Sequence, residues 1–96
     1  MALLDSLIEK RAELLLLARQ HGASNVRLFG SVVRRQETPS SDVDILIDLS
    51  EERGFDDYLA LAEEFEALIG RKVDLVTSRG LSPFLKARVE KEARPL

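Results

Sequence analysis

The chain of 96 residues has no cysteine and a single histidine, His21. Without cysteine, the chain can form neither a disulfide framework nor a thiolate metal site. His21 comes at the expected end of a helix, where we expect it to be structural and favoured by the helix dipole. The composition therefore indicates neither a Cys-His pair nor a Ser-His-Asp arrangement for nucleophilic catalysis.

Long hydrophobic runs are also missing. Apolar stretches such as Leu14–Ala18 are far shorter than the roughly 20 residues that a membrane-spanning helix needs. The first residues include the acidic Asp5 and Glu9, where a signal peptide would have a basic region followed by a longer apolar one. We therefore expect a soluble, cytoplasmic protein that does not associate with a membrane.

The net charge of −3 is small, but it is unevenly distributed. Residues 1–70 have seven basic and fourteen acidic side chains, a balance of −7, whereas residues 71–96 have seven and three, a balance of +4. A basic tail can attract phosphates or an acidic partner, or it can be a solvated helix face, which is the interpretation we favour. The charge alone does not indicate direct nucleic-acid binding.

The length of 96 residues predicts a single domain over residues 1–96, and hydrophobic periodicity predicts helices and strands in alternation. The 45% hydrophobic content is ordinary for a globular protein. Glycines at 22 and 70 are suitable helix stops, and Ser82 with Pro83 is a suitable helix start. The predicted elements are helices over 4–18, 31–36, 58–69 and from 83 onwards, and strands over 25–30, 42–49 and 72–77. This order predicts an α/β (α+β) fold with a small mixed sheet of about three or more strands flanked by helices.

Acidic side chains interrupt two of these strands. Asp42 and Asp44 begin one strand and project from the same face, about 7 Å apart at their base. Two such close carboxylates repel each other unless a cation lies between them, and Mg²⁺ binds one or two carboxylates together with substrate phosphates. Asp74 lies in another strand, and adjacent strands would bring three acids together, enough for two ions. Alternatively, each aspartate simply faces solvent or caps a strand.

A glycine turn precedes this acidic strand. Gly30 ends a predicted strand and Ser31 begins a helical turn, where free backbone N–H groups can bind a phosphate. Glycine lets a ligand approach the backbone closely, and the Ser31 hydroxyl can add a hydrogen bond. Arg34, three residues further on, lies on the same helical face and can bind a phosphate through its guanidinium group.

The segment GSVVRRQETPSSDVDILI resembles the signature of the DNA polymerase beta-type nucleotidyltransferase superfamily, in particular its minimal (MNT) branch. The resemblance extends from the leading helix through VRLFGS and SDVDILI, where Ser41 also fits the pattern, to GRKVDLVT. It implies a polymerase beta-like nucleotidyltransferase fold. It also implies that Gly30 and Ser31 hold the terminal phosphates of a nucleotide, that Asp42 and Asp44 bind metal, and that Asp74 completes the triad.

The resemblance further implies an activity and a partner. We expect a Mg²⁺-dependent nucleotidyltransferase, using two ions, that moves AMP from ATP to an acceptor hydroxyl. Minimal nucleotidyltransferases of this size often pair with a small helical HEPN-type RNase toxin. They act as its antitoxin by AMPylation of a tyrosine. Two alternatives remain open: a binding module that neutralises a partner by contact alone, and transfer to a small-molecule hydroxyl with a partner subunit completing the pocket.

One position departs from the family pattern. The family commonly has a glycine after the arginine that corresponds to Arg34, and this chain has Arg35 there. The additional cation could strengthen phosphate contacts or crowd the loop. The chain also lacks the helical domain with which larger relatives grip the base or the acceptor, so the resemblance does not identify the substrate.

Overall fold

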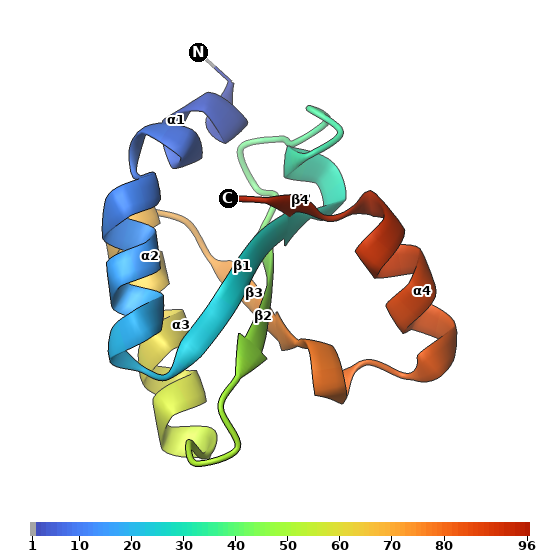
Figure 1. Ribbon diagram of the computed structural model, residues 1–96. Helices are drawn as coiled ribbons and strands as arrows, with labels where there is room; N and C mark the ends of the chain where they lie inside the picture. Colours follow the sequence, from blue (N-terminus) through green and yellow to red (C-terminus); the bar gives the residue numbers. More distant parts are fainter. Residues whose placement is uncertain (1) are drawn as a thin grey trace.

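The computed structural model describes residues 2–96 and shows helices and strands in the predicted alternation (Figure 1). The helices are α1 (Leu3–Glu9), α2 (Arg11–Gln20), α3 (Phe55–Ile69) and α4 (Pro83–Glu92), with 3₁₀ turns η1 (Gly30–Val32) and η2 (Ser78–Gly80). The strands are β1 (Ala23–Phe29), β2 (Val43–Leu49), β3 (Val73–Thr77) and β4 (Arg94–Pro95). Within residues 2–96, none of the helices combines the length and the apolar character that crossing a membrane requires.

The four strands form one mixed sheet in the order β3-β2-β1-β4. β1 runs antiparallel to both β2 and β4, whereas β2 and β3 are parallel and are connected through α3. The adjacency of β2 and β3, on which the predicted convergence of acidic residues depended, is therefore confirmed. β4 was not predicted, because a two-residue strand has no periodicity to detect.

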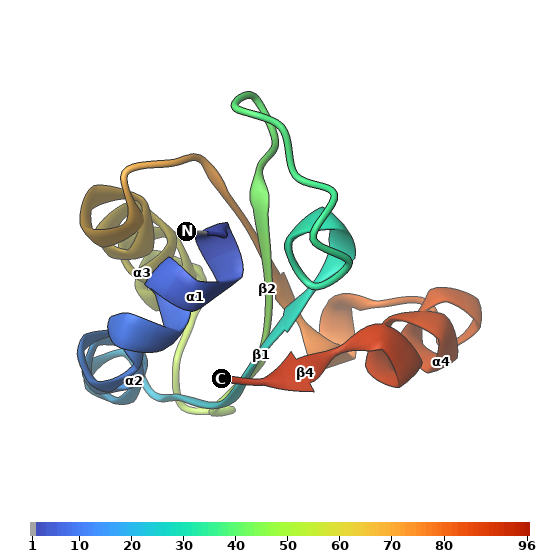
Figure 2. The ribbon, with the colours of Figure 1, turned by 90° about the horizontal axis from the view of Figure 1, so that it is seen from above.

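Three helices cover one face of the sheet, as the view along its edge shows (Figure 2). Val43, Ile45 and Ile47 of β2 are fully buried on the covered face, and Leu46, on the opposite face, is fully buried as well. Phe65 of α3 is the largest fully buried side chain. The core between the helices and the sheet comprises Leu4, Leu7, Leu14, Ala18, Ala23, Val26, Leu28, Val32, Val43, Ile45, Ile47, Leu61, Phe65, Val73 and Leu75.

The C-terminal helix α4 lies on the other side of the sheet and projects away from it (Figures 1 and 2). It begins as predicted, with the Ser82 side chain accepting a hydrogen bond from the Leu85 N–H at 3.3 Å and Pro83 in the first turn. None of the ten described residues of α4 is buried, and Phe84 is 84% exposed. The face of the sheet opposite the core is therefore only partly covered.

Two predicted helices differ from the structure. The helix predicted over residues 4–18 is divided at Lys10, which leaves helical geometry and whose Nζ donates a 3.0 Å hydrogen bond to the Leu68 carbonyl of α3. The segment 31–36 forms the single 3₁₀ turn η1 and an irregular continuation rather than one or two α-helical turns. A turn this short has no appreciable macrodipole, so any anion binding there depends on individual N–H groups and side chains.

His21 follows the last residue of α2, at the predicted helix end. Its side chain also forms ion pairs that the sequence did not predict. Its ring nitrogens lie 3.2 Å from Asp57 Oδ1 and 3.0 Å from Glu64 Oε2, both on α3. The hydrogen bond to Asp57, followed by the contacts with Glu64, raises the pKa of His21 above 6.5, although burial opposes the shift. His21 therefore links α2 to α3 most strongly when it is protonated.

This linkage predicts a pH-dependent contribution to stability. Because the pKa is raised on folding, the stabilisation is complete below the unfolded-state pKa and is lost as the pH rises through the folded-state pKa. We expect His21→Gln to melt about 2–6 °C below the parent protein at pH 5.5. The difference should shrink above pH 8, as measured by thermal denaturation at both pH values. A difference that grows with pH would contradict the ion-pair interpretation.

Candidate active site

The sheet topology brings three separate segments to one end of the molecule. The last residue of β1, Phe29, pairs with Asp44 near the start of β2, and Asp44 pairs in turn with Asp74 near the start of β3. The turn that follows β1 therefore lies beside the two strands that contain the acidic residues. Gly30, Asp44 and Asp74 are separated in the sequence and adjacent in the fold.

Gly30 lies directly against the Asp44 carboxylate. Its φ of +77° falls in the left-handed region, which favours glycine. A Cβ added at this position would collide with Asp44 Oδ2 and would lie 3.0 Å from Asp44 Cγ. The position requires glycine both for its backbone conformation and for the close approach of the acidic strand.

Asp44 is the most strongly perturbed acid described in the structure. Burial and then the negative charges of Asp74 and Asp42 raise its pKa from 3.8 to about 6, and a hydrogen bond with Asp74 acts in the same direction. The Arg34 guanidinium opposes this shift. Three carboxylates and one arginine therefore interact electrostatically at this end of the sheet, and the excess of negative charge is what a bound cation would neutralise.

The side chains of the acids do not form a complete metal cage. Asp42 lies just before β2 and is exposed, Asp44 is half-buried and Asp74 is exposed. Within residues 2–96, no group of three or more His, Asp or Glu side chains is arranged to hold one ion. A cage is not required for Mg²⁺, which uses one or two carboxylates and completes its coordination with water and phosphate. The donor set of Asp42, Asp44 and Asp74 therefore fits Mg²⁺ bound together with a substrate.

The glycine turn holds an anion that belongs to the protein itself. The Gly30 N–H donates a 2.7 Å hydrogen bond to Glu92 Oε1, and Arg34 Nη1 donates one of 2.6 Å to the same oxygen. Ser31 lies next to them in η1, half-buried, and its carbonyl accepts a hydrogen bond from the Gln36 N–H at 2.9 Å. Gly30 and Arg34 thus form a cradle for one carboxylate oxygen, and we refer to this pair as the anion cradle.

Arg35, where the family commonly has glycine, does not point toward the cradle. Its backbone φ of +57° is left-handed, which explains why glycine suits the position. The guanidinium lies 3.4 Å from Asp5 Oδ2 of α1, and both side chains are about half exposed. Of the two neighbouring arginines, Arg34 faces the acidic residues, and Arg35 pairs with the N-terminal helix.

This geometry predicts how Arg35 can be replaced. We expect Arg35→Gly to change the free energy of unfolding by less than about 1 kcal/mol, because the relief of left-handed strain offsets the lost ion pair and the added chain entropy. Arg35→Val should be less stable than Arg35→Gly by about 1–2 kcal/mol, because a β-branched residue is strained at positive φ. Urea denaturation of the three proteins measures both values. A valine variant as stable as the glycine variant would contradict the backbone argument.

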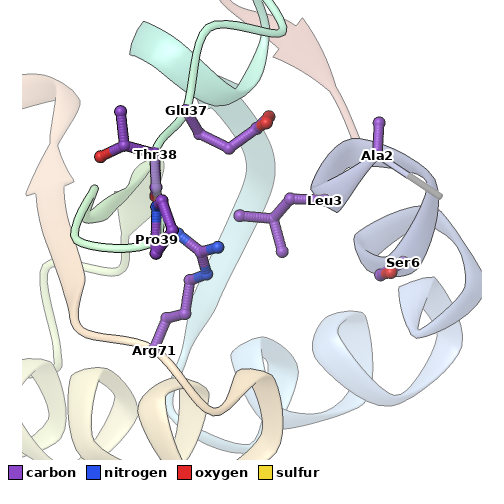
Figure 3. Close-up of a pocket in the computed structure, with 7 residues that line it drawn as sticks. All are labelled: Ala2, Leu3, Ser6, Glu37, Thr38, Pro39 and Arg71. Carbon is purple, nitrogen blue, oxygen red and sulfur yellow. The ribbon is translucent and has the colours of Figure 1, made fainter.

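The loop before Asp42 is fixed mainly from the β3 side. Arg71, in the segment that precedes β3, donates hydrogen bonds from Nη1 to the carbonyls of Thr38 at 2.8 Å and Ser41 at 3.2 Å. Figure 3 shows the Arg71 guanidinium beside Pro39 and Thr38, with Leu3 of α1 facing them across a cavity of about 280 Å³. The cavity separates this part of the loop from α1. The hydrogen bonds of Arg71 instead connect the loop before Asp42 to the segment that leads into β3 and Asp74.

Ser41 closes the same loop. Its Oγ accepts a 2.8 Å hydrogen bond from the Thr38 N–H, and its own N–H donates to the Thr38 carbonyl at 3.0 Å. The serine that fits the family pattern therefore shapes the turn that leads into Asp42. Asp48, on the same face of β2 as Asp44, accepts a 2.8 Å hydrogen bond from Arg27 Nη2 and a 3.1 Å hydrogen bond from Asn25 Nδ2. Its side chain remains 45% exposed.

Sequence reasoning missed Arg71 and Glu92. Glu92 is one of several alternating charges in a helix with no buried residues, and nothing in that pattern indicates that it reaches Gly30. Arg71 follows the helix-ending Gly70, where a basic residue is usual. Tyr58 packs at the edge of the core: its hydroxyl donates to the Leu75 carbonyl, and its ring stacks on Phe55 with centroids 5.9 Å apart.

A mixed four-stranded sheet with a glycine turn beside two acidic strand starts is the architecture of a polymerase beta-like nucleotidyltransferase. The chain belongs to this family: the family model "Polymerase beta, Nucleotidyltransferase" matches residues 15–96. The matched region begins within α2 and includes every residue of the candidate site.

Two relatives share this sequence over most of its length. The protein named protein adenylyltransferase MntA from Thermococcus cleftensis is 37% identical over 76 residues, which cover 79% of this chain and 77% of the relative. A protein from Methanocaldococcus jannaschii that carries the name protein adenylyltransferase MJ0435 is 32% identical over 85 residues, covering 88% and 91%. The relatives of this nucleotidyltransferase are thus named for AMP transfer to protein.

Solved structures agree with the fold. A structure described as a minimal nucleotidyltransferase superposes with a TM-score of 0.89 and 42% identity, covering 97% of this chain and 95% of the other. A toxin–antitoxin structure with AMP-PNP has a TM-score of 0.75 at 23% identity, covering 88% and 69%. A complex of a tri-AMPylated Shewanella oneidensis HEPN toxin with its MNT antitoxin has a TM-score of 0.68 at 22% identity, covering 90% and 67%. The last two similarities establish a common fold.

Proposed function

We propose that this nucleotidyltransferase transfers AMP from ATP to a tyrosine hydroxyl of a small helical HEPN-type toxin and thereby acts as its antitoxin in the cytoplasm. The observation that carries the proposal is the position of Asp44. This carboxyl group, with its pKa raised to about 6, lies against the glycine turn and interacts with both Asp42 and Asp74. This concentration of negative charge lies beside a glycine at which a ligand can approach the backbone closely, and together they suit a triphosphate bound with a metal ion.

The acidic residues have different roles in the proposed reaction. Asp42 and Asp44 are the candidates to hold Mg²⁺, with Asp74 as a further ligand if two ions bind. Bound Mg²⁺ supplies charge neutralisation at the α-phosphate and at the departing pyrophosphate. The exposed Asp74 also stands where an acceptor can approach from solvent, so it is the candidate general base for the proton of the acceptor hydroxyl.

The glycine turn positions the donor. Gly30 N–H and Arg34 already hold a carboxylate oxygen at 2.7 and 2.6 Å, distances typical of charge-assisted hydrogen bonds, so the same groups can hold a phosphate oxygen. The acceptor oxygen attacks the α-phosphorus, the bond to the β-phosphate oxygen breaks, and pyrophosphate leaves. In this scheme Ser31 supplies an additional hydrogen bond to the phosphates, and most of the rate enhancement comes from positioning and charge.

The comparisons support the choice of nucleotide and acceptor. The relatives named above are protein adenylyltransferases, and one structure of the same fold contains AMP-PNP, an analogue of ATP. Another is of an MNT antitoxin with a HEPN toxin that carries three AMP groups. These properties belong to those proteins, and the shared fold and family make them the best-supported proposal for this chain.

Labelled ATP tests the proposal. The protein is incubated with Mg²⁺ and with the product of the neighbouring gene, which the proposal expects to be a small helical protein, using ATP labelled at either the α- or the γ-phosphate. We expect the α-label to enter the partner and the γ-label to remain in pyrophosphate, and EDTA should prevent labelling. Entry of the γ-label would indicate a kinase instead, and no labelling at millimolar ATP would contradict the proposal.

A further inference from the structure

Glu92 occupies the anion cradle that the proposed function assigns to the nucleotide phosphates. One oxygen, Oε1, accepts both hydrogen bonds, from Gly30 N–H at 2.7 Å and from Arg34 Nη1 at 2.6 Å. These two donors cannot serve a phosphate oxygen at full strength while the carboxylate is present. A carboxylate and a phosphate also repel each other when they share one site.

The C-terminal segment can release Glu92 at low cost. Glu92 is the last residue of α4, a helix in which none of the ten described residues is buried. Beyond it, β4 pairs with β1 through only two residues, Arg94 and Pro95. The partly buried Leu96 fixes the end of this segment through its N–H, which donates to the Val26 carbonyl at 3.0 Å. The Glu92 side chain can therefore leave the cradle without loss of core packing.

We propose that Glu92 is an internal competitor for the triphosphate, a removable carboxylate that closes the anion cradle until a nucleotide displaces it. The proposal rests on the proposed function, because it assumes that the cradle receives the phosphates of the donor. It has two consequences. Glu92 lowers the affinity of the protein for ATP, and its return to Gly30 and Arg34 after transfer promotes release of pyrophosphate.

Matched variants test the competition directly. Glu92→Ala removes the competing carboxylate, Glu92→Gln removes its charge and keeps the shape, and Glu90→Gln removes the same charge two residues away. Glu90 is a suitable control because it contacts Ser78 Oγ at 3.3 Å and Arg27 at 4.0 Å rather than the cradle. Affinities for Mg²⁺-ATP and for Mg²⁺-pyrophosphate are measured by calorimetry on the full chain.

We expect Glu92→Ala to bind both ligands about tenfold more tightly than the parent, as the loss of one competing charge-assisted interaction implies. The affinities of Glu92→Gln should lie between those of the parent and of Glu92→Ala. The affinities of Glu90→Gln should stay within about twofold of the parent values, because solvent and salt screen a surface charge. Hydrogen exchange at the Gly30 amide supplies a readout without nucleotide. This amide should be protected in the parent and should exchange faster in Glu92→Ala.

The possible outcomes separate this inference from the proposed function. If the parent binds ATP and the Glu92 variants bind no more tightly, or if Glu90→Gln gives the same increase, the competition is disproved and the proposed function stands. If the parent fails to bind and Glu92→Ala binds, the inference is confirmed in its strongest form. If ATP and pyrophosphate bind to none of the proteins, both proposals fail.

Discussion

Replacing Asp44 with asparagine is expected to reduce AMP transfer by at least about a hundredfold to a thousandfold and to make the metal-free protein more stable. The loss of activity follows from the removal of the carboxylate that lies between Asp42 and Asp74 beside Gly30. The gain in stability follows from the same position, because a half-buried charge that is surrounded by other negative charges destabilises the fold when no cation is bound.

The pH dependence of this effect has a definite sign. A carboxyl group whose pKa rises from 3.8 to about 6 on folding stabilises the folded state at low pH, when it is protonated, and loses that contribution as the pH rises between those values. Above pH 6, Asp44→Asn should therefore exceed the parent in the free energy of unfolding by about 1–2 kcal/mol, because solvent screens part of the repulsion at this half-buried position, and the difference should decrease toward pH 4. Urea denaturation in EDTA at pH 4, 5, 6 and 7 measures it.

Asp48→Asn is the matched control for Asp44→Asn. Asp48 points to the same face of β2 but pairs with Arg27 and Asn25 at the far end of the strand. Its replacement should leave transfer within about threefold of the parent and should lower stability slightly, because an exposed ion pair is lost. An Asp44→Asn protein that retains normal transfer would exclude Asp44 as a metal ligand, and equal losses in both variants would indicate a general effect of charge.

The second large effect is expected from Asp74→Asn, which should separate partner binding from catalysis. Asp74 lies on the edge strand β3 and is exposed, so asparagine should be accommodated without a change in the fold. We expect the variant to bind the proposed toxin partner with a dissociation constant within about threefold of the parent value, as for a single surface substitution. Transfer should fall by at least about a hundredfold, because the proposed general base and metal ligand are removed by the same substitution.

Binding and neutralisation are measured separately for this variant. Calorimetry or surface plasmon resonance gives the affinity for the partner, and growth of cells that express the partner gives neutralisation. We expect Asp74→Asn to bind the partner but to leave the cells unprotected. If Asp74→Asn protects cells as well as the parent does, contact alone suffices, and the binding-module alternative replaces the enzyme.

The sequence predicted the parts of the fold that follow from local patterns. Alternation in residues 43–49 identified the buried face of β2, and the glycines at 22 and 70 marked the ends of α2 and α3, where φ is +73° and +78°. The division of the first helix at Lys10 was not predictable, because it depends on a hydrogen bond to Leu68, distant in the sequence. Short-range periodicity contains no information about such a contact.

The sequence also predicted part of the candidate site. The spacing of Gly30, Asp42 and Asp44 indicated nucleotide chemistry, and the parallel pairing of Asp44 with Asp74 confirmed that the third acid lies on the adjacent strand. The metal and phosphate roles of these residues remain predictions. The position of Glu92 could not be predicted, since it depends on how β4 returns the end of α4 to the edge of β1.

The intact mass of the partner tests the central claim most directly. The product of the neighbouring gene, which the proposed function expects to be a small helical protein, is co-expressed with the parent or with Asp74→Asn and purified. Its intact mass is then measured by mass spectrometry, with tandem fragmentation to locate any modification. The proposed function predicts mass increments of one or more AMP units on tyrosine with the parent protein and an unmodified partner with Asp74→Asn. An unmodified partner in cells that the parent protects would contradict it.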